Sequence, residues 1–359
     1  MKTTSPYLHP AFKFNGLQYQ IEDLKLFAKD LESKGDKHEV SIGIFIQQWF
    51  NDRDHVLVKT SGSTGKPKEV KLNKSHMLNS AEATGIFFKL GENTRALLCL
   101  PSNFIAGKMM LVRAMTLGWD LHVVAPEKDA LTQYDNEYDF VAMVPYQVNY
   151  SIDALQKVKK LIIGGGTISS DLEKKLFEVD TEVFATYGMT ETLTHIAVRR
   201  INGLAHSPHY TALPNVKFSV DERNCLEIDA PSISDEKVFT NDMVKLMSPT
   251  TFKWLGRYDH VINSGGIKIY PEELEKKLSV FIDLPFVITS LKDDQLGERL
   301  ILIIEKSKNK DLPDYSEVFS KLNKYERPKK IYSFSKFPYT ETGKIIRSKV
   351  LDLLLKSLK

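Results

Sequence analysis

Hydrophobic residues in the first two-thirds of the chain form short apolar runs, and stretches of helical spacing separate these runs. Short apolar runs are typical of strands that are buried on both faces of a parallel sheet. The runs that predict strands are residues 95–100, 119–124, 140–145, 160–163 and 182–185. The stretches that predict helices are residues 75–88, 105–117 and 169–177. This alternation predicts repeated βα units and a right-handed, mostly parallel sheet.

The pattern changes in the last third of the chain. Residues 204–254 contain short strand-like segments separated by turns, which predicts a β-rich subdomain. After residue 257 the chain predicts a hairpin, a helix that Pro271 opens, and an amphipathic helix over residues 345–358. We therefore expect an α/β fold with a large domain over residues 1–257 and a small, mobile α+β domain over residues 258–359.

Composition narrows the function classes. The chain has 359 residues, 42% of them hydrophobic, so it can bury a large core. A net charge of +3 favours neither a nucleic-acid surface nor a membrane surface. Cys99 and Cys225 are far apart in sequence, which indicates neither a disulfide framework nor a zinc site. No signal sequence and no membrane-spanning run is recognisable, so we expect a cytoplasmic protein without membrane insertion.

The first segment that could bind a ligand directly follows the apolar run 56–58. It combines hydroxyls, glycines and a cation, which are the groups that bind phosphate. Its residues are Thr60, Ser61, Gly62, Ser63, Thr64, Gly65 and Lys66. Pro67 follows the lysine, where a Walker A loop would have Ser or Thr. A flexible turn with a solvated lysine is the alternative interpretation.

Two further segments follow predicted strands, at the edge where α/β sheets bind ligands. Tyr187 and Gly188 can accommodate a flat base, and Thr190 and Glu191 place a hydroxyl and a carboxylate together for a phosphate and its Mg²⁺. A turn with a helix cap is the alternative. The other segment consists of three glycines and allows either a ligand or simply a tight turn, namely Gly164, Gly165 and Gly166.

Two more segments lie in the last third of the chain. Residues 256–275 predict a hairpin with the turn Gly265-Gly266, followed by a helix with an acidic first turn, but this pattern does not explain Arg257 and Asp259. Residues 338–344 form a polar turn that ends in Lys344. A lone lysine in such a turn is usually just solvated.

These five segments, in this order and at this spacing, resemble the adenylate-forming superfamily of acyl- and aryl-CoA ligases, luciferases and adenylation domains. The resemblance covers about residues 55–350 and implies an N-terminally shortened version of the family fold. Within the superfamily, the length and residues 187–197 are most similar to the 2-succinylbenzoate:CoA ligases of menaquinone biosynthesis. The resemblance implies an acyl-CoA ligase that uses a carboxylic acid, ATP, Mg²⁺ and CoA, with 2-succinylbenzoate as the leading acid.

The resemblance also assigns roles to residues in the two-step reaction. The loop at residues 60–66 would close over the β- and γ-phosphates, while the three glycines and Tyr187 would flank adenine. Thr190 and Glu191 would serve the phosphates and Mg²⁺, and Asp242 and Arg257 would bind the ribose. Lys344 would bridge the attacking carboxylate and the α-phosphate as a cation. Rotation of the small domain about Asp259 would then bring the Gly265-Gly266 hairpin to the acyl-adenylate, to line the CoA channel.

The acid pocket is the least determined part of the prediction. Asn103 and Lys108 lie where the family builds a pocket wall, but the aromatic-His pair of many members is missing. A second carboxylate on the substrate needs a cationic partner, for which the candidates are Lys108, Arg113, His195 and Arg199. Two alternatives stay open: a related acyl- or aryl-CoA synthetase, and a non-catalytic nucleotide-binding homologue. The oligomeric state, a homodimer included, stays open too.

Overall fold

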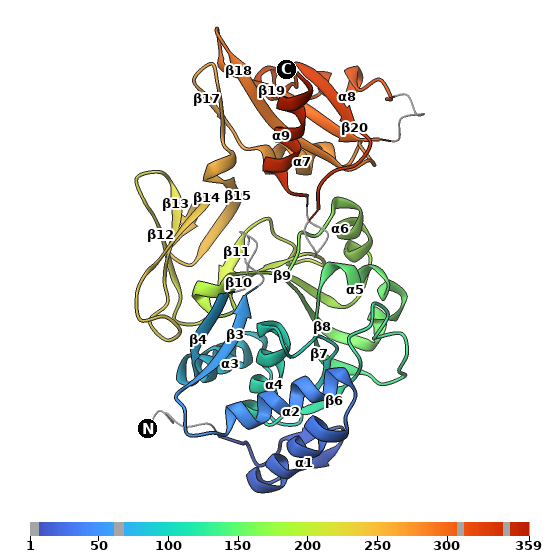
Figure 1. The fold of residues 1–359 in the computed structure, drawn as a ribbon, viewed down its shortest axis with the longest axis vertical. Helices are drawn as coiled ribbons and strands as arrows, with labels where there is room; N and C mark the ends of the chain where they lie inside the picture. Colours follow the sequence, from blue (N-terminus) through green and yellow to red (C-terminus); the bar gives the residue numbers. More distant parts are fainter. Residues whose placement is uncertain (1–6, 61–67, 307–311, 340–344, 359) are drawn as a thin grey trace.

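The computed structural model describes residues 7–60, 68–306, 312–339 and 345–358, without the side chains of residues 59, 60 and 68. A sheet of 13 strands forms the centre of the larger part, and a sheet of 5 strands lies in the upper part of the molecule (Figure 1). The chain changes from the first sheet to the second between Arg257 and Ile262. The domain boundary at residue 257 stays a prediction.

The central strands of the large sheet, β6, β5, β7, β8 and β9, are parallel to one another. This arrangement confirms the expected sheet of βα units. From one edge to the other, the sheet contains β12 (Lys217–Val220), β13 (Cys225–Asp229), β14 (Val238–Ser248), β15 (Thr251–Arg257), β11 (Tyr210–Ala212), β10 (His195–Arg200), β9 (Glu182–Gly188), β8 (Val158–Ile163), β7 (Tyr138–Met143), β5 (Arg95–Leu98), β6 (Asp120–Val123), β1 (Lys13–Phe14) and β2 (Leu17–Gln18).

Helices cover both faces of the parallel strands. Ala96 and Leu98 of β5 belong to the apolar core on one face, whereas Leu97 and Cys99 belong to the core on the other face, because successive strand residues point in opposite directions. The first core contains residues of α1 to α4, and the second contains residues of α6. The helices of this part are α1 (Ile21–Lys34), α2 (Lys37–Trp49), α3 (Lys74–Phe88), α4 (Ile105–Leu117), α5 (Pro145–Asn149) and α6 (Ser170–Phe177), with the short 3-10 helices η1 (Ile152–Lys157) and η2 (Thr190–Thr192).

The β-rich region is not a separate sheet. Strands β11 to β15 continue the large sheet with antiparallel pairing, and β10 joins them to β9. Their inner residues form an apolar core of their own, in which Phe252 is fully buried. The predicted subdomain is therefore the antiparallel end of a continuous sheet.

The second sheet has the order β17, β16, β19, β18. In addition, β20 pairs with β19 in the parallel direction. Pro271 occupies the first turn of α7, as predicted, because a helix N-terminus does not need its missing N–H. The elements of this part are η3 (Tyr258–His260), β16 (Ile262–Ser264), β17 (Ile267–Ile269), α7 (Pro271–Leu278), β18 (Phe286–Asp293), β19 (Gly297–Glu305), α8 (Ser316–Ser320), η4 (Lys324–Glu326), β20 (Lys330–Phe334) and α9 (Arg347–Ser357).

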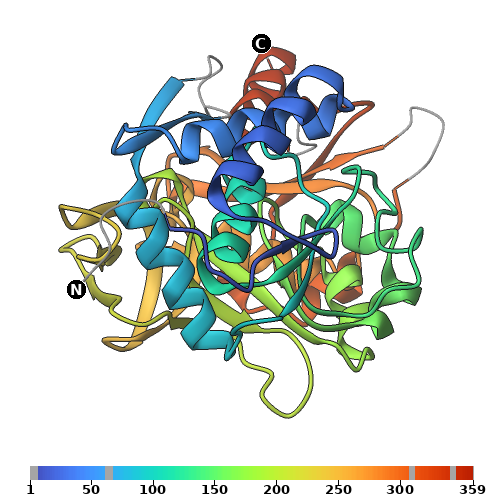
Figure 2. The ribbon, with the colours of Figure 1, turned by 90° about the horizontal axis from the view of Figure 1, so that it is seen from below.

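Two features near the N-terminus were not predicted. Helices α1 and α2 pack against each other and bury Leu24, Phe45 and Trp49, at the end of the molecule that faces the viewer in Figure 2. A hairpin of β3 (His55–Thr60) and β4 (Lys68–Asn73) flanks the predicted phosphate loop. No helix in the described ranges is long and apolar enough to cross a membrane.

Candidate active site

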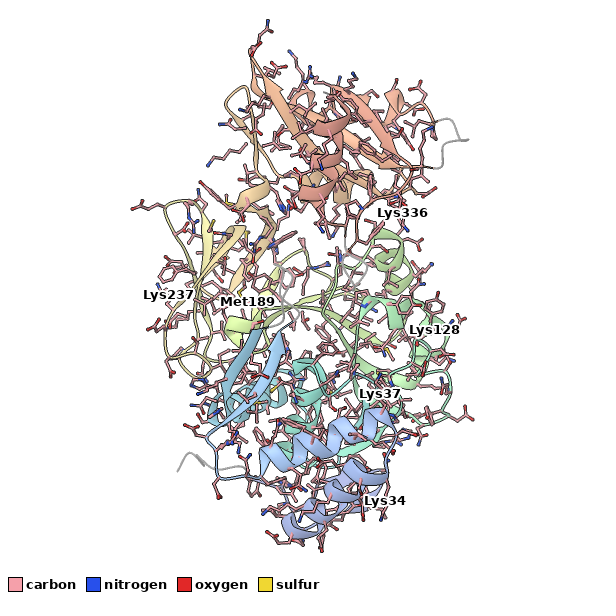
Figure 3. The ribbon with its side chains drawn as sticks, viewed as in Figure 1. Lys34, Lys37, Lys128, Met189, Lys237 and Lys336 are labelled. Atoms are coloured by element: carbon pink, nitrogen blue, oxygen red, sulfur yellow. The ribbon has the colours of Figure 1, made fainter. Side chains whose placement is uncertain are left out.

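The carboxyl ends of the parallel strands gather several predicted residues at one edge of the sheet. Asn103 follows β5, the glycines at 164–166 follow β8, and Thr190 follows β9. Met189, the residue before Thr190, lies near the middle of the molecule in Figure 3, whereas Lys34, Lys128 and Lys237 lie at its periphery. Parallel strands share one carboxyl edge, so the sheet brings together segments that are up to 87 residues apart (103 to 190).

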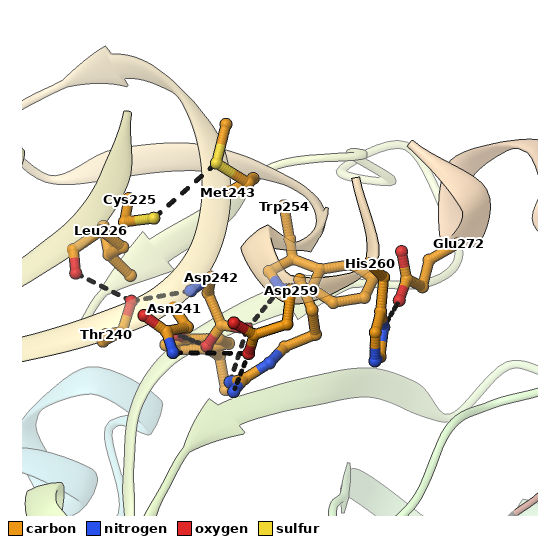
Figure 4. Close-up of polar contacts among 12 residues, drawn as sticks. Cys225, Leu226, Thr240, Asn241, Asp242, Met243, Trp254, Asp259, His260 and Glu272 are labelled. Carbon is orange, nitrogen blue, oxygen red and sulfur yellow. Dashed lines mark hydrogen bonds and ion pairs between the residues drawn. The ribbon is translucent and has the colours of Figure 1, made fainter. Parts of the chain in front are cut away.

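The carboxylate of Asp242 contacts three residues from two strands, β9 and β15, and Figure 4 shows its position beside Trp254. Tyr187 of β9 donates its hydroxyl to Asp242 at 2.6 Å, and the indole of Trp254 donates to it at 3.2 Å. Arg257 lies 3.4 Å from the same carboxylate and directly opposite Asp242 in the ladder of β14 and β15. Tyr187, Asp242 and Arg257, which come from separate segments, are thus brought into one cluster.

Burial and charge fix the state of the tyrosine in this cluster. Burial first, and then the Asp242 carboxylate, raise the pKa of Tyr187 far above its usual range, so the hydroxyl stays protonated and donates a hydrogen bond to Asp242. Asp242 is only 6% exposed, while Arg257 is half-buried. Sequence reasoning missed Trp254. Its position two residues before the glycine-arginine pair at the end of β15 is the only signal that could have pointed to it.

Two of the predicted glycines, Gly164 and Gly188, have little room for a side chain. A Cβ on Gly164 would lie 2.6 Å from the hydroxyl oxygen of Thr186. Its neighbour Gly165 has a φ of +73°, which favours glycine for a different reason. A Cβ on Gly188 would lie 2.3 Å from the carbonyl oxygen of Thr194, because β9 and β10 are very close there. Contacts within the chain therefore already require glycine at position 188, and a bound base is not needed to explain it.

Thr190 and Glu191 form the short helix η2 and are exposed. No hydrogen bond or ion pair engages either side chain within the described ranges. No set of three His, Cys, Asp or Glu side chains in these ranges could hold a metal ion by itself. Glu191 fits a Mg²⁺ that is held mainly by phosphate oxygens and water, because such a site needs only one or two protein carboxylates.

The residues expected at the hinge and the CoA channel lie beyond β15. Asp259 in η3 is exposed and lies 3.7 Å from Arg257, and Asn241 donates to it at 3.4 Å. Gly265 and Gly266 form the turn between β16 and β17, with φ angles of +60° and +79° that favour glycine. The hinge and channel roles themselves stay predictions.

A pair next to Asp259 was not predicted. His260, the residue after Asp259, makes a close contact with Glu272 of α7 through its Nδ1 atom (Figure 4). Gly256 provides the space for this contact, since a Cβ there would lie 2.4 Å from Glu272 Oε2. The sequence shows the acidic first turn of α7, to which Glu272 belongs, but this pattern indicated favourable charge at a helix start and not a contact with His260.

The candidates for the acid pocket have different environments. Asn103 is exposed, and its side chain makes no hydrogen bond with another described residue. Lys108 is buried with its ammonium 4.7 Å from the centre of the Phe45 ring, and burial lowers its pKa to about 8. Arg113 lies 3.3 Å from His195, and both are buried. Arg199 already binds Glu173 at 2.7 Å, so it is a poor partner for a substrate.

Part of the predicted site lies outside the described residues. Ser61 to Lys66 of the phosphate loop and Lys344 belong to these segments, as does the side chain of Thr60. The backbone of Thr60 ends β3 and pairs with Lys68 at the start of β4. The hairpin therefore fixes both ends of the loop. The roles of the loop and of Lys344 stay predictions.

Comparison with known proteins shows what this arrangement resembles. The family model described as "AMP-binding enzyme" matches residues 27–227, which is more than half of the chain. A 2-succinylbenzoate--CoA ligase from Staphylococcus epidermidis is 26% identical over 93% of this chain and 76% of its own length. The 2-succinylbenzoate--CoA ligase of Bacillus subtilis is 25% identical over 88% of this chain and 71% of its own.

Solved structures agree with this family. An acyl-CoA synthetase (AMP-forming)/AMP-acid ligase II-like protein from Dyadobacter fermentans is 34% identical, with a TM-score of 0.63 over 92% of this chain and 98% of its own. The O-succinylbenzoate coenzyme A synthetase of Bacillus subtilis, in complex with ATP and magnesium ion, shares the fold, with a TM-score of 0.70 and 18% identity over 93% of this chain and 82% of its own.

Proposed function

This chain belongs to the AMP-binding enzyme family, and from this premise we propose that it is an AMP-forming acid:CoA ligase whose acid substrate is 2-succinylbenzoate. The observation that carries the nucleotide half of this proposal is the cluster around Asp242, in which Tyr187 and Arg257 meet one buried carboxylate. The acid is proposed from the names of the relatives, which are 25–26% identical to this chain.

The reaction has two balanced steps. A carboxylate oxygen of the acid attacks the α-phosphorus of ATP, forms an acyl-adenylate and releases pyrophosphate. The thiol of CoA then attacks the acyl carbon, a proton leaves the sulfur, and AMP departs as the thioester forms. A bound Mg²⁺ would neutralise charge on the phosphates, and Glu191 is the carboxylate placed to hold it.

The residues of the cluster have separate tasks in the first step. Asp242 accepts hydrogen bonds from the ribose hydroxyls, while Tyr187 and Trp254 keep its carboxylate in position. The Tyr187 ring and the glycines at 164–166 line the space for adenine. Lys344 brings positive charge to the reacting oxygens, where one well-placed donor contributes on the order of 10²–10³-fold.

The decisive experiment mixes the full chain with ATP, Mg²⁺, CoA and 2-succinylbenzoate. We expect pyrophosphate and AMP in equal amounts, together with a 2-succinylbenzoyl-CoA thioester identified by mass spectrometry. Lys344→Ala should abolish pyrophosphate release but still convert supplied acyl-adenylate and CoA into thioester. Absence of turnover with 2-succinylbenzoate, combined with turnover of a simple fatty or aromatic acid, would reject the proposed substrate.

A second candidate is an acyl- or aryl-CoA synthetase with another acid. The observation in its favour is the Dyadobacter fermentans protein, which has the higher identity of 34% and of which this chain covers 98%. A panel of carboxylic acids, scored by pyrophosphate release, separates the two candidates. A non-catalytic homologue would release no pyrophosphate with any acid of the panel.

We also propose that the protein acts in the cytoplasm, where a reducing environment suits Cys99 and Cys225, both of which are free and buried. The homodimer is likewise a proposal. Sedimentation of the purified chain tests the oligomeric state, and fractionation of the producing cells tests the location.

A further inference from the structure

Arg113 is a buried cation to which the described part of the chain offers no anionic partner. Its side chain lies inside the main core and the residue is 2% exposed. Helix α4, which carries both Arg113 and Lys108, contains no acidic residue. No carboxylate pairs with Arg113 in the described ranges, and burial alone lowers its pKa to about 9, so the guanidinium stays charged at neutral pH. A buried, unpaired charge costs several kcal/mol.

Within the described residues, every hydrogen bond of Arg113 is with a neutral group, and each of these bonds is long. Its Nε atom lies 3.3 Å from the Thr84 hydroxyl, and its Nη1 lies 3.8 Å from the sulfur of Met110. Its Nη2 lies 3.4 Å from the Thr194 hydroxyl and 3.3 Å from Nδ1 of His195. Charge-assisted hydrogen bonds to carboxylates are typically about 2.7–2.9 Å long. These long contacts therefore satisfy the donors of the guanidinium only weakly.

Two other buried arginines show what Arg113 lacks. Arg199 donates to Glu173 at 2.7 Å, and Arg347 donates two hydrogen bonds to Glu275 at 2.8 and 2.7 Å. In both cases a carboxylate from another element neutralises the charge. The fold thus provides an acidic partner for buried arginines elsewhere, which makes the neutral surroundings of Arg113 distinctive.

His195 provides a second unused donor at the same place. A guanidinium can only donate, so Nδ1 of His195 accepts from Arg113, and the proton of the neutral ring is on Nε2. Burial first, and then the charge of Arg113, hold the pKa of His195 well below its usual range, which keeps the ring neutral. Its buried Nε2 atom has no hydrogen-bond partner in the described ranges.

The pair lies directly behind the candidate active site. His195 begins β10 and pairs with Gly188 at the end of β9, and the turn between them is η2 with Thr190 and Glu191. Arg113 reaches this turn from α4, because its Nη2 contacts both Thr194 and His195. The helix itself starts just beyond the carboxyl end of β5, at the same edge of the sheet.

We propose that Arg113 and His195 form an anion subsite at the inner end of the acid pocket, and that this subsite receives the second carboxylate of a dicarboxylic acid. This inference rests on the proposed acid:CoA ligase function. The first carboxylate of the acid reacts with ATP, and the second one neutralises Arg113 and accepts from Nε2 of His195. A monocarboxylic acid of the same shape leaves the charge of Arg113 without an anion and Nε2 of His195 without an acceptor, so the enzyme discriminates against it.

The test compares two acids that differ only in the second carboxylate: 2-succinylbenzoate and 4-oxo-4-phenylbutanoate. Pyrophosphate release gives kcat/KM for each acid. The measured quantity is the ratio of kcat/KM for the diacid to kcat/KM for the monoacid. We expect the wild-type ratio to be about 100 or more. Arg113→Met should lower it at least tenfold by slowing the diacid selectively, His195→Phe should lower it less, and Arg113→Lys should retain part of it.

A matched control and a binding measurement keep the test interpretable. Arg200→Gln changes an arginine of the same strand as His195 that pairs with Glu182 at 3.0 Å, and it should leave the ratio unchanged. If Arg113→Met does not fold, the Tm of the wild type is measured with each acid instead. The diacid should raise the Tm at least twice as much as the monoacid. Equal shifts, or a ratio that Arg113→Met and Arg113→Lys leave unaltered, overturn the subsite.

The two proposals fail in different ways. If the wild type converts 2-succinylbenzoate but Arg113→Met slows both acids equally, the subsite is wrong and the function stands. If the wild type converts only other acids, the proposed substrate is wrong, and pairs such as phthalate with benzoate and glutarate with butyrate then test the subsite. The subsite is supported if the wild type prefers the diacid of a pair and Arg113→Met removes this preference. Equal use of both members of each pair rejects the subsite.

Discussion

Lys276 of α7 lies 3.2 Å from the carboxylate of Glu173 of α6, so an ion pair links a helix of the small sheet to a helix of the large one. Glu173 is also bound by Arg199 of β10 at 2.7 Å, which fixes its carboxylate within the large part. A hydrogen bond between the hydroxyls of Ser170 in α6 and Ser279, the residue after α7, lies at the same contact. These contacts stabilise one arrangement of the two sheets.

Lys276→Ala should shift the balance between the two half-reactions. The lysine side chain is 59% exposed, and such a pair contributes about 0.2–1 kcal/mol, which corresponds to a shift of up to about fivefold in population. If adenylation and thioester formation use different arrangements, the ratio of their rates should change by about two- to fivefold. Single-turnover measurements of pyrophosphate release, and of thioester formation from supplied acyl-adenylate, give this ratio.

Lys321→Ala is the matched control for this experiment. Lys321 is similarly exposed, at 56%, and pairs with Glu317 within one turn of α8, away from the contact between the sheets. It should leave the ratio unchanged. The idea that this ion pair selects an arrangement fails if Lys276→Ala and Lys321→Ala give the same ratio as the wild type.

Asp242→Asn should weaken the binding of ATP while the fold persists. The amide retains one acceptor oxygen, which can serve either Tyr187 or Trp254 but not both, and it loses the charge that faces Arg257. Hydrogen bonds to charged groups contribute about 1.5–3 kcal/mol, so the KM for ATP should rise about 10- to 100-fold. Tyr187→Phe, which keeps the ring, should raise it less. Urea unfolding checks that both variants are folded, and an unchanged KM in Asp242→Asn contradicts the ribose role.

The parallel part of the fold was predictable because its strands are buried on both faces. The apolar runs at residues 95–100 and 160–163 correspond to β5 and β8, and the helix predicted over residues 105–117 has the bounds of α4. The continuity of the antiparallel strands with this sheet was not predictable. It depends on the pairing of β10 with β9, and the sequence pattern of a strand does not reveal its partner.

The candidate site was predictable in its residues but not in their contacts. Tyr187, Asp242 and Arg257 were each named from local segments, and only the folded sheet shows that they meet. Trp254 and Glu272 were missed because each acts on a residue that is 12 positions away along the chain. Arg113 could be named as a cation, but only the packing of α3 and α4 shows that its partners among the described residues are all neutral.

Arg347→Met should destabilise the small part of the molecule strongly. Arg347 opens α9, three residues after Lys344, and its guanidinium donates to Glu275 and to the carbonyl oxygen of Ile288. Both Arg347 and Glu275 are 19% exposed, and removal of one partner of a buried pair costs about 3–5 kcal/mol. The free energy of unfolding in urea measures this loss.

The double variant Arg347→Met/Glu275→Met should recover much of that stability, because two apolar side chains leave no uncompensated charge. The expected result is a double variant that is more stable than Arg347→Met alone. If the double variant instead loses the sum of the two single losses, the pair is not coupled, and Arg347 acts mainly through the Ile288 carbonyl.

Glu272→Gln should remove a pH-dependent contribution to stability. Burial raises the pKa of Glu272, but the hydrogen bond with His260 and the charge of Arg347 outweigh this effect and hold it below the usual value of 4.5. A carboxyl group with a lowered pKa stabilises the fold fully above its unfolded pKa, and this contribution is lost as the pH falls through the folded pKa. The difference in unfolding free energy between wild type and Glu272→Gln should therefore shrink between pH 5.5 and pH 3.

Glu317→Gln, at a glutamate that is 85% exposed, should show a much smaller change over the same range. A difference for Glu272→Gln that stays constant with pH would show that His260 and Arg347 do not stabilise its charged form.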